Sequence, residues 1–372
     1  MTIKLLGHSD LNGFGKTMQS MPFRNYLFVG HLIPGKGTSI LDISNPREPK
    51  IIGELPGFKN TMSPKVQIVD ELLFVNYEQR GTEKAEKVGF SVFDIGNPKE
   101  PKEISFYNTG GQGVHRITYT GGRYAYVTAI PEGFLDRMLL IIDMTNPVKP
   151  IEAGRWWLPG QWTQGGETPT WPQGLKYKLH HAIPHGNRAY LGMWDGGMYI
   201  LDTTDLSNIK VLNSLCWSPE DGGCTHTALP LPGRNLLIVT DESTRDKCQE
   251  PPKYVRVIDI QDEKAPKVLS KFPVPQGDYC NKGLRFGPHN LHENWPGTFQ
   301  SEELIFVTYN NAGIRVVDIS DPFSPVEVDS YVPIDPPGVE AIQTTDVYVE
   351  ANGIIYTTDR AGGGIHILEK VD

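Results

Sequence analysis

Short apolar runs that end in an acidic residue recur along the whole chain. Successive acidic residues of these runs are 52, 49, 59, 57, 59 and 51 positions apart. A repeat of roughly 40–50 residues or more that contains only strand-like segments is typical of a β-propeller. Seven copies predict seven blades around one axis. The acidic residues are Asp42, Asp94, Asp143, Asp202, Asp259, Asp318 and Glu369.

The third repeat shows most clearly how one blade is built. Alternating apolar and polar residues predict its strands, and a glycine pair and a proline-rich segment predict the turns between them. We therefore expect an all-β chain with four-stranded antiparallel blades. The strands are expected at 114–119, 124–127, 139–143 and 151–157, and the turns at 121–122 and 146–150.

The two ends of the chain predict how the ring closes. The last repeat stops just after its third strand, and the segment Ile3–Gly7 has the pattern of a fourth strand with no third strand before it. Residues 1–10 are therefore expected to supply the outer strand of blade seven, which covers two open sheet edges. On this interpretation residues 1–372 form a single seven-bladed domain.

The recurring run has the pattern apolar-apolar-Asp, then Ile or Thr, then Ser or Thr. An Asx-Pro-x-x-Pro turn follows it at 45–49, 97–101 and 321–325. This combination resembles the LVIVD-repeat family over nearly the whole chain. The resemblance implies a β-propeller and supplies no catalytic residue. A weaker likeness is to the selenium-binding proteins, which also carry strand-Asp-Ile-Ser-Asp-Pro segments in a seven-bladed ring, although their longer motifs are absent here.

Charge and composition limit the classes of partner. A net charge of -9 argues against a nucleic-acid partner, which needs clustered Lys and Arg. No apolar run is long enough to span a membrane, and the start MTIKLLGHSD lacks a signal-peptide pattern, so we expect a soluble, cytoplasmic protein with no membrane partner. Four cysteines without a Cys-x-x-Cys motif are expected to be buried or free thiols.

Histidines gather where repeats begin their first strands. Because the first strand of each blade lines the axis of a propeller, four consecutive blades should direct imidazoles into one channel. Neutral imidazoles in a confined channel are suited to a divalent transition metal, with iron favoured and manganese or zinc as alternatives. His180 and His181 point to opposite sides of a strand, and we take His181 as the ligand. The expected metal ligands are His115, His181, His226 and His289.

Loop lengths distinguish the two faces of the predicted ring. The short-turn face carries the first-to-second and third-to-fourth turns, for example 121–122 and 185–187. The long-loop face carries the second-to-third loops and the links between blades, and the first strands open on this face. Elaborated loops on a rigid scaffold usually carry function. The long segments are 76–88, 128–138, 158–178, 240–254 and 274–288.

Several residues near the long-loop face are candidates for contact with a small-molecule substrate. Aromatic side chains could form the wall of a pocket, and arginines could bind a carboxylate. The candidates are Trp162, Trp171, Tyr177, Arg116, Arg285 and Arg360. Three further residues could move a proton or hold a metal-binding histidine in place through a hydrogen bond, namely Glu293, His292 and Asp346.

These features favour a metal-dependent enzyme with its site on the axis. A four-histidine shell is similar in arrangement to the iron centre of the carotenoid-cleavage oxygenases and favours oxidation of an aromatic or unsaturated substrate. The first alternative is a lyase or hydrolase on a carboxylate- or sugar-containing substrate, similar to the oligogalacturonate lyases. The second is a binding propeller without chemistry. No nucleotide-binding, zincin or serine-hydrolase motif is present.

Overall fold

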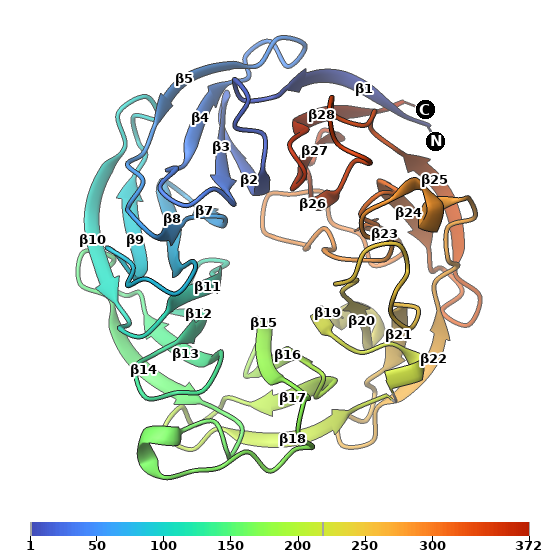
Figure 1. Cartoon of the computed structure of the whole chain (residues 1–372). Helices are drawn as coiled ribbons and strands as arrows, with labels where there is room; N and C mark the ends of the chain where they lie inside the picture. Colours follow the sequence, from blue (N-terminus) through green and yellow to red (C-terminus); the bar gives the residue numbers. More distant parts are fainter. Residues whose placement is uncertain (1, 218, 372) are drawn as a thin grey trace.

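Antiparallel sheets follow one another around a central axis and form a ring (Figure 1). The computed structural model of the chain describes residues 2–217 and 219–371. Apart from β1, the strands run from the axis outward in chain order within each sheet, and helical segments are few and short. The all-β, propeller-type architecture predicted from the repeat is therefore confirmed.

The first half of the ring is built from β2 to β14. The first sheet contains β2 (Thr17–Phe23), β3 (Tyr26–His31), β4 (Ser39–Asp42) and β5 (Lys50–Glu54). The short β6 (Thr61–Met62) precedes the next sheet, formed by β7 (Val66–Val69), β8 (Leu72–Gln79), β9 (Gly89–Asp94) and β10 (Lys102–Asn108). The strands that follow are β11 (Gly113–Thr118), β12 (Tyr124–Ile130), β13 (Met138–Asp143) and β14 (Ile151–Trp156).

The second half of the ring runs from β15 to β28. Two four-stranded groups come first, namely β15 (Tyr177–His185), β16 (Arg188–Trp194), β17 (Met198–Asp202) and β18 (Lys210–Leu215), then β19 (Thr225–Leu231), β20 (Leu236–Asp241), β21 (Val255–Asp259) and β22 (Lys267–Lys271). The last strands are β23 (Leu304–Thr308), β24 (Ile314–Asp318), β25 (Val326–Tyr331), β26 (Thr344–Val349), β27 (Ile354–Asp359) and β28 (Gly364–Val371).

Strand β1 (Thr2–Ser9) joins the two ends of the chain. It pairs antiparallel with β28, with Thr2 opposite Val371 and Ser9 opposite Ile365. The sheet order is β1-β28-β27-β26, so the N-terminal strand is the outermost strand of the sheet that contains the C-terminal strands (Figure 1).

The aspartate that marks each of the first six repeats stabilises the turn after the third strand. The Asp42 carboxylate accepts a hydrogen bond from the Ser44 N–H at 2.9 Å, and Asp318 accepts one from the Ser320 N–H at 2.7 Å. The same bond to the residue two positions on is made by Asp94, Asp143, Asp202 and Asp259. This Asx turn explains why an acidic residue recurs at this position.

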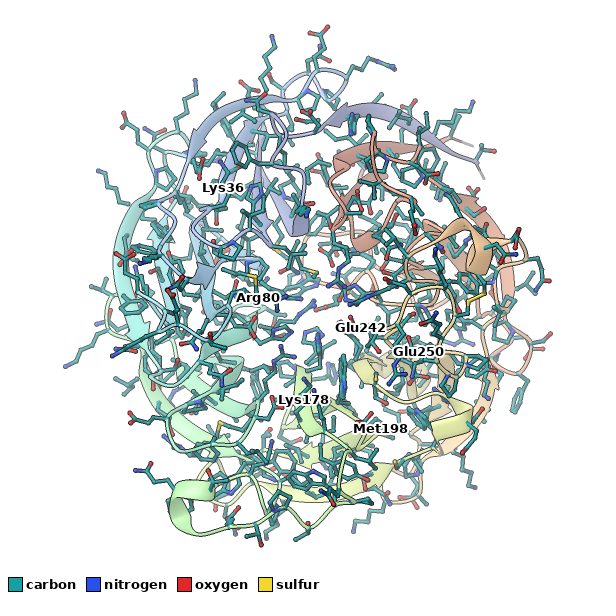
Figure 2. All side chains as sticks on the ribbon, viewed as in Figure 1. Lys36, Arg80, Lys178, Met198, Glu242 and Glu250 are labelled. Carbon is teal, nitrogen blue, oxygen red and sulfur yellow. A yellow bond between two sulfur atoms is a disulfide. The ribbon has the colours of Figure 1, made fainter. Side chains whose placement is uncertain are left out.

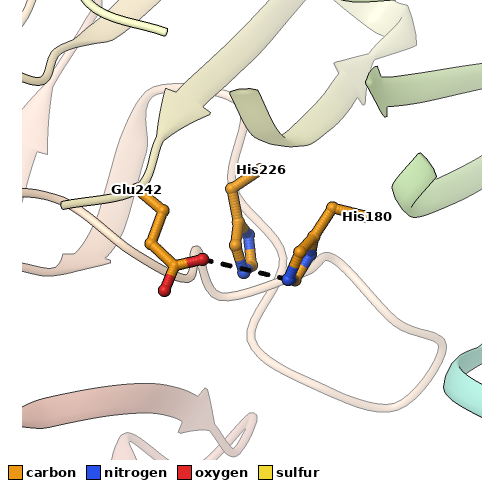
Figure 3. A group of neighbouring side chains, drawn as sticks. All are labelled: His180, His226 and Glu242. Atoms are coloured by element: carbon orange, nitrogen blue, oxygen red, sulfur yellow. Dashed lines mark ion pairs between the residues drawn. The ribbon is translucent and has the colours of Figure 1, made fainter. Parts of the chain in front are cut away.

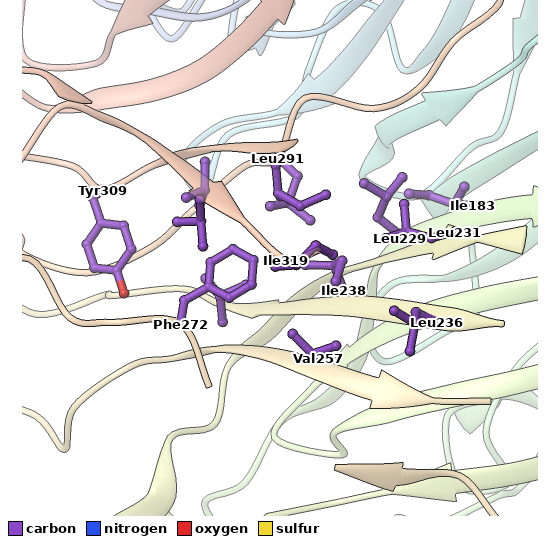
Figure 4. Packing of buried hydrophobic residues seen from close by; sticks show 14 of the residues in the cluster. Ile183, Leu229, Leu231, Leu236, Ile238, Val257, Phe272, Leu291, Tyr309 and Ile319 are labelled. Carbon is purple, nitrogen blue, oxygen red and sulfur yellow. The ribbon is translucent and has the colours of Figure 1, made fainter. Parts of the chain in front are cut away.

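Neighbouring sheets pack face to face through apolar side chains. In one interface, Ile238 and Val257 of the β19–β22 sheet contact a cluster that includes Ile305 and Val307 of β23 (Figure 4). Every one of these four side chains is buried. Burial of an aliphatic side chain stabilises the fold by roughly 1.5–3 kcal/mol, so repeated interfaces of this kind hold the ring together.

An irregular segment occupies the innermost position beside β23. The N–H groups of His289 and His292 donate to the carbonyl oxygens of Thr308 and Phe306, both at 2.9 Å. The segment therefore runs along β23 as an inner strand would, although its geometry is irregular. The sequence predicted a regular first strand here.

Two cysteines form a disulfide, which corrects the expectation of four thiols. Cys248 is bonded to Cys280, which lies in the short helix α1 (Tyr279–Lys282), whereas Cys216 and Cys224 are free. The bond joins the loop after β20 to the segment before β23, and both belong to the long-loop face. Among the described residues, no helix has the length and apolar character needed to cross a bilayer.

Candidate metal centre

Two histidines and a glutamate meet close to the middle of the ring. His180 lies in β15, His226 in β19 and Glu242 directly after β20. One nitrogen or oxygen atom of each lies within 4.8 Å of the others, and all three residues are buried. Figure 3 shows His226 between the other two, with Glu242 Oε2 3.9 Å from His180 Nε2, and Figure 2 shows Glu242 near the centre of the ring. This group could hold a metal ion.

Two further histidines extend this group on either side. His115 Nε2 lies 3.0 Å from His180 Nε2. On the other side, the rings of His226 and His289 are 4.5 Å apart between centroids, and His289 Nε2 lies 3.7 Å from Glu242 Oε1. We call His115, His180, His226, His289 and Glu242 the imidazole cluster. Its four histidines come from β11, β15, β19 and the segment before β23.

Irregularities in the inner strands direct these imidazoles toward the axis. The pairing of β11 with β12 shifts between Val114 and Arg116, so His115 is the extra residue of a bulge. His226 occupies the same position between Thr225 and Thr227 in β19. Because a bulge bends its strand and re-aims the side chain at that point, these histidines leave the alternation of their strands.

The ring nitrogens that face away from the cluster are held by hydrogen bonds. His115 Nδ1 bonds to the Glu78 carboxylate at 3.0 Å, His226 Nδ1 to Thr227 Oγ1 at 2.7 Å and His289 Nδ1 to the Thr345 carbonyl at 2.5 Å. Partners of this kind fix the tautomer of a metal-binding histidine and leave Nε2 available. Among the described residues, His226 Nε2 has no hydrogen-bond partner.

The protein environment keeps the imidazoles uncharged. Burial lowers the pKa of His115 and of His289 to about 3. Burial, followed by the neighbouring imidazoles, places the pKa of His180 and of His226 well below 6.5. Neutral imidazole is the form that binds a metal. Burial alone would raise the pKa of Glu242, but His289 when protonated and the permanent charges of Arg360 and Arg285 lower it, so this carboxylate is ionised.

Two of the predicted substrate-binding arginines lie against Glu242. Arg285 Nη1 is 3.2 Å and Arg360 Nη1 3.6 Å from Glu242 Oε1. Their side chains are 25% and 23% exposed, so both also face solvent. The two guanidinium groups compensate the charge of Glu242 and fix its position beside the histidines.

A second buried polar group lies on the inner strands beside the imidazole cluster, and Thr227 and Asn290 contact residues of both groups. Arg116 donates to Asn290 Oδ1 at 2.9 Å and to Glu293 Oε1 at 2.5 Å. His181 lies in this group, 3.0 Å from Thr118 Oγ1 and 3.6 Å from Glu293. The structure therefore brings His180, and not the expected His181, into the imidazole cluster.

The three residues predicted to move a proton also lie outside the cluster. Glu293 is paired with Arg116. His292 Nε2 bonds to the Phe299 carbonyl at 2.7 Å, and its Nδ1 accepts from the Val349 N–H, so both ring nitrogens have structural partners. Burial raises the pKa of Asp346 to about 7, against the opposing effect of Arg116 and Lys65.

The predicted aromatic residues lie on the link into β15. Trp171 stacks on Tyr177 with ring centroids 5.4 Å apart. Trp162 is 41% exposed and packs against Phe134 and Trp157. Only Tyr177 of this predicted set borders a pocket beside the imidazole cluster.

The sequence interpretation missed Glu78 and Glu242. Each lies at or directly after the end of a second strand, where a long loop begins. Glu78 pairs through its backbone with Gly113, which explains why it reaches His115 from the neighbouring sheet. A carboxylate in the last residues of a second strand, next to a blade with an inner-strand histidine, was the available signal.

Comparison with known proteins identifies the repeats. The model of the LVIVD repeat family matches residues 24–55, 120–156, 185–215 and 301–332. The chain carries LVIVD repeats. Each matched LVIVD segment covers the outer three strands of a sheet and leaves out every histidine of the imidazole cluster. The LVIVD repeats therefore account for the frame of the ring and leave the site unexplained.

Solved structures with similar folds are distant from this chain in sequence, and one of them is described as a β-propeller domain. The β-propeller domain of Cps50 (Swd1) from Myceliophteria thermophila has a TM-score of 0.57 at 13% identity, over 96% of this chain and 97% of that chain. The N-terminal domain of Nup159 has a TM-score of 0.58 at 8% identity, over 99% and 95%. Raptor from Chaetomium thermophilum has a TM-score of 0.62 at 12% identity, over 99% of this chain and 28% of that chain. No curated protein matches the LVIVD-repeat chain by sequence. At these identities the likeness shows the fold alone.

Proposed function

We propose that the chain is one seven-bladed propeller domain and a metal-dependent enzyme, with a divalent transition metal bound by the imidazole cluster. The proposal rests on one observation. His180, His226 and Glu242 meet at one buried point, and the imidazoles of His115 and His289, from two further parts of the ring, flank this group on either side. A purely structural core has no need for this convergence.

The geometry of the cluster suits metal ligands. The 3.0 Å between His115 Nε2 and His180 Nε2 is a hydrogen-bond distance. At this distance both nitrogens could also serve as ligands of one ion, because metal–nitrogen distances are about 2.0–2.1 Å. Three of the four imidazoles have Nδ1 held by a side chain or carbonyl, which is the arrangement of metal-binding histidines.

We favour oxidation of a small aromatic or unsaturated organic molecule, with iron as the metal, because the ligand set is rich in imidazole. Bound there, the ion would supply redox or Lewis-acid chemistry. The protein would contribute a dry site and the fixed charges of Arg285 and Arg360 beside Glu242. These guanidinium groups would hold Glu242 in one position and attract an anionic substrate from solvent toward the imidazole cluster.

A lyase or hydrolase activity is the second candidate, and the position of Glu242 favours it. This carboxylate lies directly beside His180 and His289 and could accept a proton from a substrate or from water. In this case zinc or manganese would suit the site as well as iron.

Elemental analysis of protein purified without a histidine tag tests the proposal. We expect about one transition-metal ion per chain in the wild type, and little in His226→Ala or His289→Ala. His185→Ala is the matched control, because His185 is exposed on the short-turn face. Retention of the metal in both cluster variants, or a metal-free wild type with variants that are merely less stable, would support the binding propeller instead. Turnover without dioxygen would then separate the lyase or hydrolase from the oxygenase.

A further inference from the structure

A pocket of about 590 Å³ lies next to the imidazole cluster. It is bordered by the link into β15, the end of β16, the segment before β19 and the loop after β20. Its volume falls within the range of small-molecule sites. Neither the LVIVD repeats nor the proposed metal ligands account for it.

One wall of this pocket is shared with the imidazole cluster. Trp194 borders the pocket, and its indole stacks on the His180 ring with centroids 5.5 Å apart and an angle of 18°. His180 is the histidine of the cluster whose Nδ1 lacks a hydrogen-bond partner among the described residues. The indole therefore takes over the orienting role that hydrogen bonds perform for His115, His226 and His289.

The backbone of Trp194 is strained in a way that supports this role. Its φ is +53°, a left-handed conformation that bulky residues rarely adopt. Pairing with Thr225 and the hydrogen bond from the Asp195 N–H to the Lys176 carbonyl hold the chain there. Backbone strain of this kind persists where the surrounding structure fixes the residue, and such residues cluster at functional sites.

The cations of the pocket have weak partners. Lys178 Nζ lies 4.9 Å from the centre of the Trp194 ring, and its nearest carboxylate, on Asp136, is 4.0 Å away. Lys253 is 5% exposed and lies 3.5 Å from Glu250, while it donates to the Gly222 carbonyl at 3.0 Å. Lys178 thus borders the pocket with only a distant carboxylate partner, and Lys253 with the single partner Glu250.

The carboxylates of the pocket are already engaged by the backbone. Asp195 Oδ2 accepts from the Lys176 N–H at 2.8 Å. Glu250 accepts from the N–H groups of Thr244 and Arg245, at 2.5 and 2.8 Å, and so closes its own loop. The lining therefore presents positive charge to a ligand.

Aromatic rings form the remaining walls. Tyr177 is fixed by its stack on Trp171, and Trp217 by its contact with the Arg256 guanidinium, 4.0 Å from the ring centre. Rings held in this way offer flat surfaces to a flat ligand.

We infer that this pocket binds a planar organic anion, a single-ring aromatic carboxylate, with its carboxylate toward Lys178 and Lys253 and its ring against Trp194. This inference names a substrate class for the proposed enzyme and rests on that proposed function for the reaction alone. Binding itself requires no metal ion, because none of these residues is a proposed ligand.

The test is calorimetric titration of chelator-treated protein with benzoate. Cyclohexanecarboxylate serves as the non-planar probe and benzamide as the uncharged one. We expect saturable benzoate binding, with both other probes at least tenfold weaker. Lys178→Met should weaken benzoate at least tenfold, whereas Lys149→Met, in an exposed turn, should leave it unchanged.

A second measurement does not depend on the lysine variant. Cys216 is an exposed free thiol that borders the pocket, so benzoate should slow its reaction with a thiol reagent in a Cys224→Ser background. Equal affinity for benzoate and benzamide, unchanged binding in a folded Lys178→Met variant, or an unprotected Cys216 would overturn the inference. These assays contain no metal, so a failure here does not affect the result of the elemental analysis. In the same way, a protein that binds no metal could still bind benzoate.

Discussion

The two faces of the ring use hydrogen bonds in different ways. On the short-turn face, each marker aspartate bonds to the N–H two residues along the chain, as Asp318 does with Ser320. On the long-loop face, His115 bonds to Glu78, 37 residues away, and His289 bonds to Thr345, 56 residues away. Local bonds that recur in six repeats build the frame, whereas long-range bonds that are each made once build the site. The following predictions test this division, from the largest expected effect to the smallest.

Removal of Arg116 should have the largest effect on stability. Arg116→Met leaves the Glu293 carboxylate, 6% exposed, without its partner, and loss of one member of a buried ion pair costs about 3–5 kcal/mol. The free energy of unfolding in denaturant measures this. Arg24→Met is the matched control, because the exposed Arg24–Glu71 pair should contribute at most about 1 kcal/mol. Similar losses in both variants would contradict the expected difference.

Loss of the disulfide should come next. The Cys248–Cys280 bond closes a loop of 32 residues and should stabilise the fold by about 2–4 kcal/mol. The double variant Cys248→Ser/Cys280→Ser should unfold at a lower temperature. It should also bind metal more weakly, since the joined segments precede His289 and follow Glu242. A variant with unchanged metal affinity would show that these loops position themselves without the bond.

Acid should destabilise the metal-free protein through its imidazoles. The pKa of His289 is about 3 in the folded protein because of burial, against about 6.5 when unfolded. The unfolded chain therefore binds a proton between pH 6.5 and pH 3 that the folded chain does not, so stability present above pH 6.5 is lost as the pH falls. Each such imidazole contributes about 1.4 kcal/mol per pH unit.

Denaturant unfolding at several pH values measures this slope. In His289→Gln we expect a slope smaller by about 1.4 kcal/mol per pH unit than in the wild type. An unchanged slope would mean that His289 is protonated in the folded state.

The smallest effect is expected on the short-turn face. Asp318→Ala removes one partly solvated turn bond and should cost roughly 0.5–1 kcal/mol, with the metal content unchanged. Thermal unfolding and elemental analysis check both statements. A loss of metal in this variant would contradict the expectation that the short-turn face does not affect the metal site.

The frame could be predicted from the sequence because its signals are local. The third repeat was expected to have strands at 124–127 and 139–143, and β12 and β13 cover these residues. Alternation and Asx-Pro turns act within a few residues, so one sequence is enough to reveal them. The disulfide was missed because the positions of Cys248 and Cys280 depend on how two loops meet.

The site was predicted in part, for a physical reason. Strand alternation predicts that His115 lies near the axis but carries no information on the bulge that directs it. At the pair His180 and His181, the irregular start of β15 decides which ring reaches the cluster. The roles of Glu78 and Glu242 depend on contacts between neighbouring sheets, so their position at the end of a second strand marks them as candidates but does not reveal which histidine each one reaches.

The pairing of β1 with β28 has a mechanical consequence. Thr2 lies opposite Val371, so the two outer ends of this pair are side by side. A pulling force applied to these two residues would break the hydrogen bonds between β1 and β28 one after another, until the ring opens. A load applied between Thr2 and Ile365 would instead shear all the bonds of the pair together and meet much greater resistance.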